Sequence, residues 1–217
     1  MPSRLRPTSS VAAEAILVGD PGRALLLAQE LLEQPKMSNH ARGLWGYTGR
    51  TPAGSELTVQ STGMGGPSAA VVLGDLAELG VRRAIRIGTC TALDPELAPG
   101  QLLVVGEAHA WSGGGAGEPM LPDPGLTAAL GDRLGEEART AAVASLDTLH
   151  GAGAPAPVSA GDAADMQTAS LFARGSALGV ALAAVLIVAE SAGNESLEDE
   201  AAESAAKRAG KAVLDVI

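Results

Sequence analysis

Two kinds of hydrophobic pattern alternate along this chain. Short apolar runs of strand length occur at residues 15–18, 57–60, 84–87, 102–105, 141–145 and 185–188. Between them, apolar residues recur with helical spacing at residues 25–32, 69–79, 126–134, 165–178 and 198–217. Such runs predict strands, and such spacing predicts amphipathic helices. Strands that alternate with helices are typical of an α/β sheet covered by helices.

The chain is long enough to form one domain with its own core. It has 217 residues, of which 46% are hydrophobic, and we expect a single domain over residues 1–217. Residues 112–125 and 151–160 are rich in Gly and Pro. Both segments therefore predict surface loops between the regular elements.

The charge of the chain narrows the kind of ligand. With 25 acidic and 15 basic residues the net charge is −10, whereas nucleic acids are bound by clustered Lys and Arg. We therefore expect no nucleic acid as a partner. An anionic small molecule would need a local cationic pocket that acts against the overall field.

Other features of the composition favour the cytoplasm. Cys90 is the only cysteine, which excludes an internal disulfide and a cysteine-based zinc site and fits a reducing compartment. The three histidines show no metal-binding spacing, so we expect no metal. Glu14 and Asp20 interrupt the first apolar stretch, so no signal peptide is predicted. The longest apolar run, residues 180–189, is too short to cross a bilayer, so we expect no membrane partner.

Three glycine-rich turns follow predicted strands. Residues 19–23 read Gly-Asp-Pro-Gly-Arg, residues 61–68 read Ser-Thr-Gly-Met-Gly-Gly-Pro-Ser, and Arg86 and Thr89 flank Gly88. The first two turns start helices, whose free N–H groups and dipole attract anions. Arginine can grip a phosphate through two N–H groups. Because ligands of α/β proteins gather at the carboxyl ends of strands, the three turns predict an anion site.

Each turn also has a purely structural interpretation. Gly-Asp-Pro-Gly forms a good β-turn, and a single Gly-x-Gly-Gly is a weak signal. Arg86 is harder to explain structurally, because an unpaired guanidinium is costly to bury in a strand. The three features together favour an anion site, but they do not identify a reaction.

Four motifs taken together resemble the hexameric purine nucleoside and uridine phosphorylase family. They are the turn at residues 19–23, Asn-x-x-Arg-Gly-x-x-Gly-Tyr-Thr-Gly at 39–49, the turn at 61–68, and Arg-Ile-Gly-Thr-Cys at 86–90. Their order and spacing match from about residue 18 to residue 217. The resemblance implies the fold of that family, an α/β domain with a mixed central sheet covered by helices.

The resemblance also implies how phosphate is bound. In the family, the residues that match Gly19, Arg23, Arg86 and Thr89 bind phosphate, and the residue that matches Arg42 reaches it from a neighbouring subunit. This implies a homo-oligomer with shared active sites, a hexamer built as a trimer of dimers.

The nucleoside side of the site follows from the same resemblance. Met64 matches a region beside the ribose, and Asp165-Met166-Gln167 looks like the Glu-Met-Glu of the family. There the methionine packs on the sugar and the second acid holds the ribose hydroxyls. Glu190, at the end of the last strand, matches the aspartate that protonates the leaving purine.

The reaction that the resemblance implies is phosphate-dependent cleavage of the N-glycosidic bond of a purine nucleoside, giving free base and ribose 1-phosphate. Inorganic phosphate is the nucleophile and co-substrate, and arginines hold it in line. A carboxylic acid assists departure of the base. No metal or organic cofactor is required.

Three residues that face the sugar or the leaving base depart from the family pattern. Gln167 replaces an acid, so it can bond a ribose hydroxyl only without charge. Asp165 is a shortened Glu, and Glu190 carries its carboxyl one methylene further out than Asp. Such a shift can cost orders of magnitude in rate where alignment is tight.

The base side and the 5′ side of the nucleoside site also differ. Thr91, next to Cys90 in the predicted nucleoside-binding stretch, stands where the family has Gly. Leu149 stands where an aromatic ring stacks on the base, and Arg4 replaces a His that reaches the 5′-hydroxyl across the subunit interface. The uridine enzymes carry a Gln-x-Arg pair that is absent between residues 151 and 165, which disfavours uracil.

Three functions therefore remain open from the sequence. An active phosphorylase is favoured by the number of motifs. A catalytically impaired member that only binds nucleoside or phosphate would keep the fold, and for it Met166 would be core, Gln167 a surface residue and Glu190 a solvated strand end. A hydrolytic nucleosidase is the weaker alternative, because that related group lacks the phosphate arginines that are present here.

Overall fold

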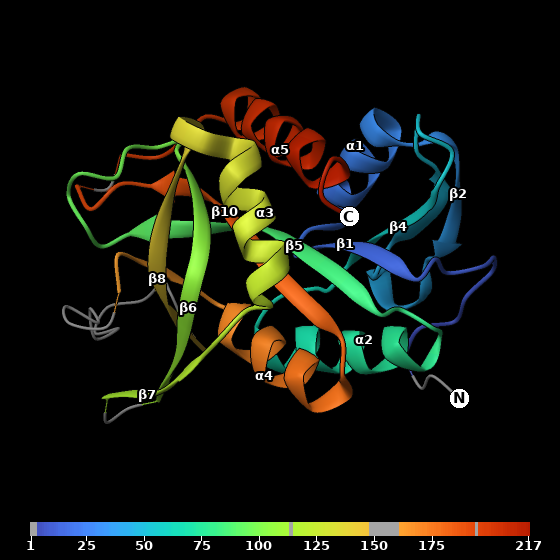
Figure 1. Cartoon of the computed structure of the whole chain (residues 1–217), viewed down its shortest axis with the longest axis horizontal. Helices are drawn as coiled ribbons and strands as arrows, with labels where there is room; N and C mark the ends of the chain where they lie inside the picture. The colour runs from blue at the N-terminus through green and yellow to red at the C-terminus, as the bar shows by residue number, and fades with distance from the viewer. Residues whose placement is uncertain (1–3, 113–114, 148–160, 194) are drawn as a thin grey trace.

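The computed structural model describes residues 4–112, 115–147, 161–193 and 195–217 (Figure 1). The described residues form ten strands: β1 (Glu14–Val18), β2 (Glu33–Asn39), β3 (Gly46–Arg50), β4 (Glu56–Ser61), β5 (Arg83–Ala92), β6 (Leu102–Ser112), β7 (Gly115–Met120), β8 (Ala138–Leu146), β9 (Ala163–Asp165) and β10 (Ala181–Glu190). The α-helices are α1 (Pro21–Leu31), α2 (Gly66–Glu78), α3 (Pro124–Leu134), α4 (Thr168–Leu178) and α5 (Asp199–Leu214). Two short 3-10 helices are η1 (Ala41–Gly43) and η2 (Gly135–Glu137).

All these strands belong to one mixed sheet, which confirms the expected fold class. The strand order is β10-β6-β8-β9-β5-β1-β4-β3-β2, with β7 paired to β6. The strand β1 runs parallel to β4 and to β5, whereas β3 pairs antiparallel with β2 and β4. As a result, the carboxyl ends of β1, β4 and β5 meet at one edge of the sheet, where the three predicted turns lie.

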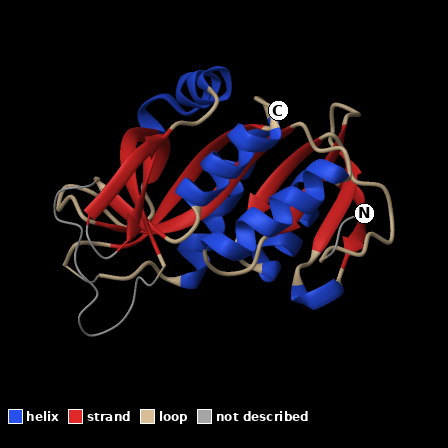
Figure 2. Ribbon diagram, turned by 90° about the horizontal axis from the view of Figure 1, so that it is seen from below, coloured by secondary structure: helices blue, strands red, loops and turns tan. Residues whose placement is uncertain are grey.

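One end of the sheet closes on itself, which the sequence pattern did not predict. The strand β10 pairs with β5 as well as with β6, while β9 joins β5 to β8. The strands β5, β10, β6, β8 and β9 therefore form a closed ring, visible as the curled strands in Figure 2. Closure removes free strand edges at this end of the molecule.

Helices cover both faces of the sheet, and each face has its own core. The helices α2 and α4 pack together on one face. Their buried Leu73 and Phe172 belong to the same core as Leu186 of the sheet. The helices α1, α3 and α5 cover the other face (Figure 1). There Leu27 of α1 and Leu130 of α3 belong to the same core as Ile187 of the sheet. None of the helices formed by the described residues is both long and apolar enough to cross a membrane.

Helix α1 starts where the sequence indicates. The Asp20 carboxylate accepts a hydrogen bond from the backbone N–H of Arg23 at 2.7 Å, and Pro21 occupies the first turn. Asp is favoured at this position because its carboxylate accepts from an unpaired N–H group of the first turn. Pro is favoured because it has no N–H group that would need a partner there. The backbone N–H of Arg23 was expected to be free to bind an anion, but it is bonded to this cap.

Several predicted boundaries were wrong; β6, for example, runs on to Ser112 instead of ending at residue 105. The strand β5 does not turn at Gly88 but continues to Ala92, because residues 91 and 92 pair with β9. The predicted helix over residues 165–178 begins only at Thr168, since Asp165 still pairs with Ser145 of β8.

Four strands were not predicted at all, among them the three-residue β9, whose Asp165 was expected to begin a helix. Residues 115–120, expected in a loop, form β7 against β6. The edge strand β2 is mostly exposed and contains Pro35, so it lacks the alternating apolar pattern of a strand. Its partner β3 is only five residues long and contains two glycines.

Candidate active site

A cavity of about 380 Å³ opens at the carboxyl ends of β1, β4 and β5. It is lined by Gly19, Asp20, Pro21, Arg23, Gly63, Met64, Gly65, Arg86, Gly88, Thr89, Met166 and Gln167. All three predicted glycine-rich turns thus contribute to one cavity, together with the link between β9 and α4. Among the described residues, no group of three or more His, Cys, Asp or Glu side chains could hold a metal ion.

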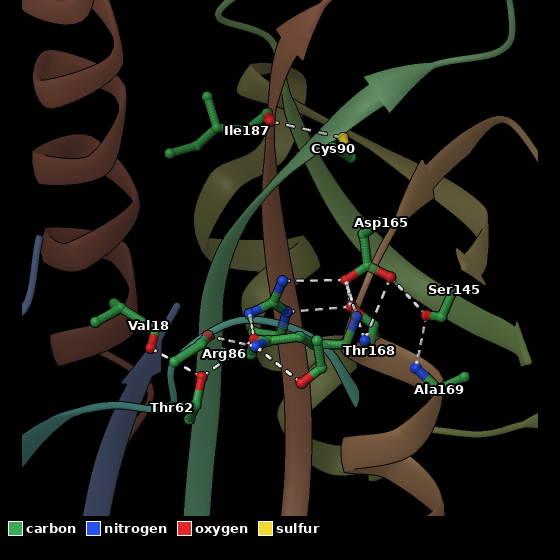
Figure 3. A network of polar contacts seen from close by, with 12 residues as sticks. Val18, Thr62, Arg86, Cys90, Ser145, Asp165, Thr168, Ala169 and Ile187 are labelled. Carbon is green, nitrogen blue, oxygen red and sulfur yellow. Dashed lines mark hydrogen bonds and ion pairs between the residues drawn. The ribbon is translucent and has the colours of Figure 1, made fainter. Parts of the chain in front are cut away.

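Arg86 forms the floor of this cavity. Its guanidinium is buried and donates from Nη2 to Asp165 Oδ2 at 3.0 Å, from Nη1 to Gln167 Oε1 at 2.7 Å and from Nε to Thr168 Oγ1 at 3.2 Å (Figure 3). A guanidinium carries five N–H groups. Within the described part of the chain, these bonds leave the second N–H of Nη1 and that of Nη2 without a protein acceptor.

Asp165 neutralises Arg86 from below and does not line the cavity. Its carboxylate is completely buried. It also accepts from Ser145 Oγ at 2.5 Å, from Thr168 Oγ1 at 2.6 Å and from the backbone N–H groups of Gln167 and Thr168. A buried ion pair persists only when the remaining lone pairs are satisfied, as they are here. The expectation that Asp165 contacts the nucleoside is therefore corrected, because its buried carboxylate is hydrogen-bonded to Arg86, Ser145 and Thr168.

Arg23 supplies a second cation on the same cavity. Burial lowers the pKa of its guanidinium, the Asp20 carboxylate opposes that effect, and the positive charge of Arg86 lowers the pKa further. Arginine nevertheless remains protonated in proteins. Its guanidinium makes no hydrogen bond or ion pair to another described side chain. Two arginines that face one cavity repel each other unless an anion lies between them.

Gly88 leaves the space that the side chain of Arg86 occupies. A methyl group built on residue 88 would lie 2.5 Å from Cζ of Arg86, far inside contact distance. Gly88→Ala is therefore expected to displace the guanidinium and to weaken binding of inorganic phosphate about tenfold or more, the worth of one charge-assisted hydrogen bond. Isothermal titration calorimetry measures this. Gly131→Ala is the control, since nothing lies within 4 Å of its methyl. Equal phosphate affinity in all three proteins would refute the assignment.

The cavity gathers seven of the predicted site residues. Met64 lies at its rim with 83% of its surface exposed, and Met166 is half-buried. Thr89, on the strand that carries Arg86, lines the cavity next to Gly88. Apolar methionines thus lie beside the two arginines. The other members are Gly19, Arg23, Arg86 and Gln167.

Cys90 and Thr91 do not reach the cavity. Cys90 is buried, its Sγ donates to the carbonyl of Ile187 at 3.6 Å, and burial raises the pKa of its thiol (Figure 3). It is therefore a core residue, contrary to the expected nucleoside contact. Thr91 lies further along β5, where it pairs with Ala164 of β9.

Glu190 and Leu149 also lie outside the cavity lining. Glu190 ends β10 at the same edge of the sheet, half-buried, and is paired with Thr91 across a bulge. The carboxyl thus lies past Thr89, whose partner in β10 is Ile187. Leu149 falls outside the described residues.

Arg42 and Arg4 share a second cavity, of about 300 Å³, with Arg6, His40 and Ala41. The chain before β1 is fixed there, since the backbone N–H groups of Arg4 and Leu5 donate to Asp75 Oδ2 at 2.7 and 2.8 Å. Arg42 itself adopts a left-handed backbone, with φ of 60°. Within one chain, the structure therefore does not bring these two arginines to the main cavity.

Two polar residues of the site were not predicted. Thr168 bridges Arg86 and Asp165, and Ser145 holds Asp165 and the backbone N–H of Ala169. Thr168 directly follows the Asp-Met-Gln motif, so its position near the site was a signal. Ser145 lies in an apolar strand, and nothing in the local pattern marks it.

The sequence of the chain is similar to those of known proteins. The model of the phosphorylase superfamily matches residues 14–217. The chain is similar to the purine nucleoside phosphorylases DeoD-type of Oceanobacillus iheyensis and Caldanaerobacter subterraneus, with 42% and 43% identity over 88 residues. These segments cover 40% of this chain and only 37% and 38% of the two relatives.

Solved structures share the fold over nearly the whole chain. A purine nucleoside phosphorylase from Toxoplasma gondii, in complex with immucillin-H, superposes with a TM-score of 0.83 at 24% identity, covering 94% of this chain and 89% of that one. A uridine phosphorylase from Vibrio fischeri superposes with a TM-score of 0.81 at 20% identity, covering 95% and 92%. On the match over residues 14–217, the chain belongs to the phosphorylase superfamily.

Proposed function

We propose that this chain is a nucleoside phosphorylase that cleaves a purine nucleoside with inorganic phosphate, giving free base and ribose 1-phosphate. The observation that carries the proposal is the pair Arg23 and Arg86 on one cavity, beside the methionines Met64 and Met166. Two guanidinium groups suit a phosphate dianion. The apolar methionines suit the faces of a sugar.

The cavity supports a simple division of labour. Arg23, Arg86 and the hydroxyl of Thr89 hold phosphate, and Gly19 allows its close approach. A phosphate oxygen forms a bond to the anomeric carbon while the bond from that carbon to the base nitrogen breaks. The bonding electrons leave with the base, which takes up a proton. Phosphate is the co-substrate, and the reaction needs no metal or organic cofactor.

The relatives support the purine. The similar curated proteins carry the name purine nucleoside phosphorylase, and the absence of a Gln-x-Arg pair between residues 151 and 165 disfavours uracil. The single free thiol of Cys90 fits a reducing compartment, and we place the enzyme in the cytoplasm.

A panel assay tests the proposal. Base release from inosine, adenosine, guanosine, uridine and methylthioadenosine is measured with and without inorganic phosphate. We expect release from a purine nucleoside only when phosphate is present. Release at the same rate without phosphate would support a hydrolytic nucleosidase, and binding of a nucleoside without release would support a catalytically impaired member.

We also propose that the active site is completed by a neighbouring subunit in a homo-oligomer, a trimer of dimers. Arg42 and Arg4 lie together on a cavity apart from the main one, where a single chain gives them no part in the reaction. If Arg42 acts on the phosphate of the neighbour, Arg42→Ala and Arg23→Ala should each be inactive. Mixed and reassembled, they should regain about a quarter of the wild-type activity, because half of the pairs are mixed and each has one intact site.

The mixing experiment has a clear negative outcome. No recovery on mixing, with exchange of subunits shown by native mass spectrometry, would mean that Arg42 acts within its own chain or not at all. Only monomer in light scattering at micromolar concentration would contradict the shared site directly.

A further inference from the structure

Gln167 makes four hydrogen bonds inside the protein. Its Oε1 accepts from Arg86 Nη1 at 2.7 Å and lies 3.1 Å from Thr62 Oγ1, whose one proton is shared with the carbonyl of Val18. Its Nε2 donates to the carbonyl of Gly63 at 2.6 Å and to that of Gly65 at 3.3 Å. A side-chain amide has two acceptor sites on its oxygen and two N–H groups. Both N–H groups of Gln167 are therefore taken by the protein, and its side chain has no donor left for a ribose hydroxyl.

The partners of Gln167 require an amide. Arg86 can only donate, and the carbonyls of Gly63 and Gly65 can only accept, so one end of the side chain must accept and the other must donate. A glutamate would keep the bond to Arg86 but would place a carboxylate oxygen against the two carbonyls. It would also add a negative charge beside Arg86, where phosphate is to bind.

The turn that Gln167 holds has little rigidity of its own. Gly63 and Gly65 both have left-handed backbones, with φ of 73° and 81°. Besides Gln167, a side-chain bond that steadies the start of this turn is that of Ser68 Oγ to the carbonyl of Thr62 at 2.6 Å. Two glycines separated by one residue leave the backbone free to move, so their position depends on such bonds.

We infer that Gln167 is a positioning residue that fixes the turn Gly63-Met64-Gly65 to the guanidinium of Arg86. Through it, the part of the cavity beside Met64 and the phosphate-binding part are held as one unit. This inference rests on the proposed function, and it replaces the ribose contact that the family resemblance implied for Gln167 by a link between two loops.

Gln167→Glu separates the two roles. If Gln167 is a link, glutamate should raise the KM for phosphate about tenfold, because its carboxylate competes with phosphate for Arg86. It should also lower kcat, because the carbonyls of Gly63 and Gly65 lose the two N–H groups that hold the turn. If residue 167 instead binds the ribose, glutamate should lower the KM for the nucleoside and leave that for phosphate unchanged. This second result would overturn the inference.

A second readout does not depend on activity. Inorganic phosphate is expected to raise the Tm of the wild type and to raise that of Gln167→Glu much less. Leu130→Ala is the control, because it loses core packing on α3 without touching the cavity, and its phosphate-induced shift should match the wild type. Equal shifts in all three proteins would refute the link. A wild type that is shifted by phosphate but cleaves no nucleoside would refute the proposed function alone.

Discussion

Replacing Asp165 by asparagine is expected to lower the free energy of unfolding by about 3–5 kcal/mol, the usual cost of leaving one partner of a buried ion pair uncompensated. Asparagine has nearly the same shape, so packing is preserved. The loss arises because Arg86, only 4% exposed, keeps its charge without a counter-ion. Urea denaturation followed by circular dichroism measures the change.

A matched control lies three residues upstream. Asp162 accepts from the backbone N–H of Ala142 and pairs with Arg139 at 3.3 Å, but its side chain is 30% exposed. Asp162→Asn should therefore cost about 1 kcal/mol or less, as for other solvent-accessible pairs. If both variants lost the same free energy of unfolding, burial of the Arg86–Asp165 pair would not be the cause of the loss.

Replacing Glu190 by alanine is expected to lower phosphorolysis of a purine nucleoside by about a hundredfold or more, the usual worth of a positioned acid. The carboxyl lies at the end of β10, half-buried, at the edge of the sheet where the cavity opens. Its distance along the strand beyond Ile187, the partner of Thr89, is consistent with a base held further out than the phosphate. Steady-state rates with saturating phosphate give the comparison.

Glu190→Asp distinguishes an acid from a solvated strand end. The family has aspartate at this position, so Asp should keep or gain activity if Glu190 donates the proton. Wild-type rates in Glu190→Ala would remove Glu190 from the mechanism. Absence of turnover in the wild type and both variants would favour the role of a binding protein.

The part of the fold near the site followed from the sequence because its signals are local. Strand, glycine-rich turn and helix start are contiguous in the chain around Gly19 and Gly63, and each turn has its own residue types. The edge strands β2 and β3 carry no such signal, because they are short or exposed and contain Pro35 or glycines. Closure through β10, β5 and β6 depends on pairings between distant segments, which no local pattern encodes.

The candidate site shows the same division. Arg23, Arg86 and Thr89 were predicted because they stand in motifs, and the structure gathers them on one cavity. The hydrogen bonds that hold Arg86 in place, to Asp165 and Thr168, were not predicted. Whether Asp165 meets the nucleoside or Arg86 depends on the register of β9 against β8, which places it opposite Ser145. The sequence motif alone could not separate these two positions.

The identity of the sugar product tests the central claim most directly. Wild-type protein is incubated with the purine nucleoside that it cleaves and with inorganic phosphate, and the mixture is followed by phosphorus NMR. We predict that one ribose 1-phosphate forms for each base released, and that Arg23→Ala abolishes this signal. Release of base with free ribose and no loss of inorganic phosphate would contradict the assignment of the cavity as a phosphorolysis site.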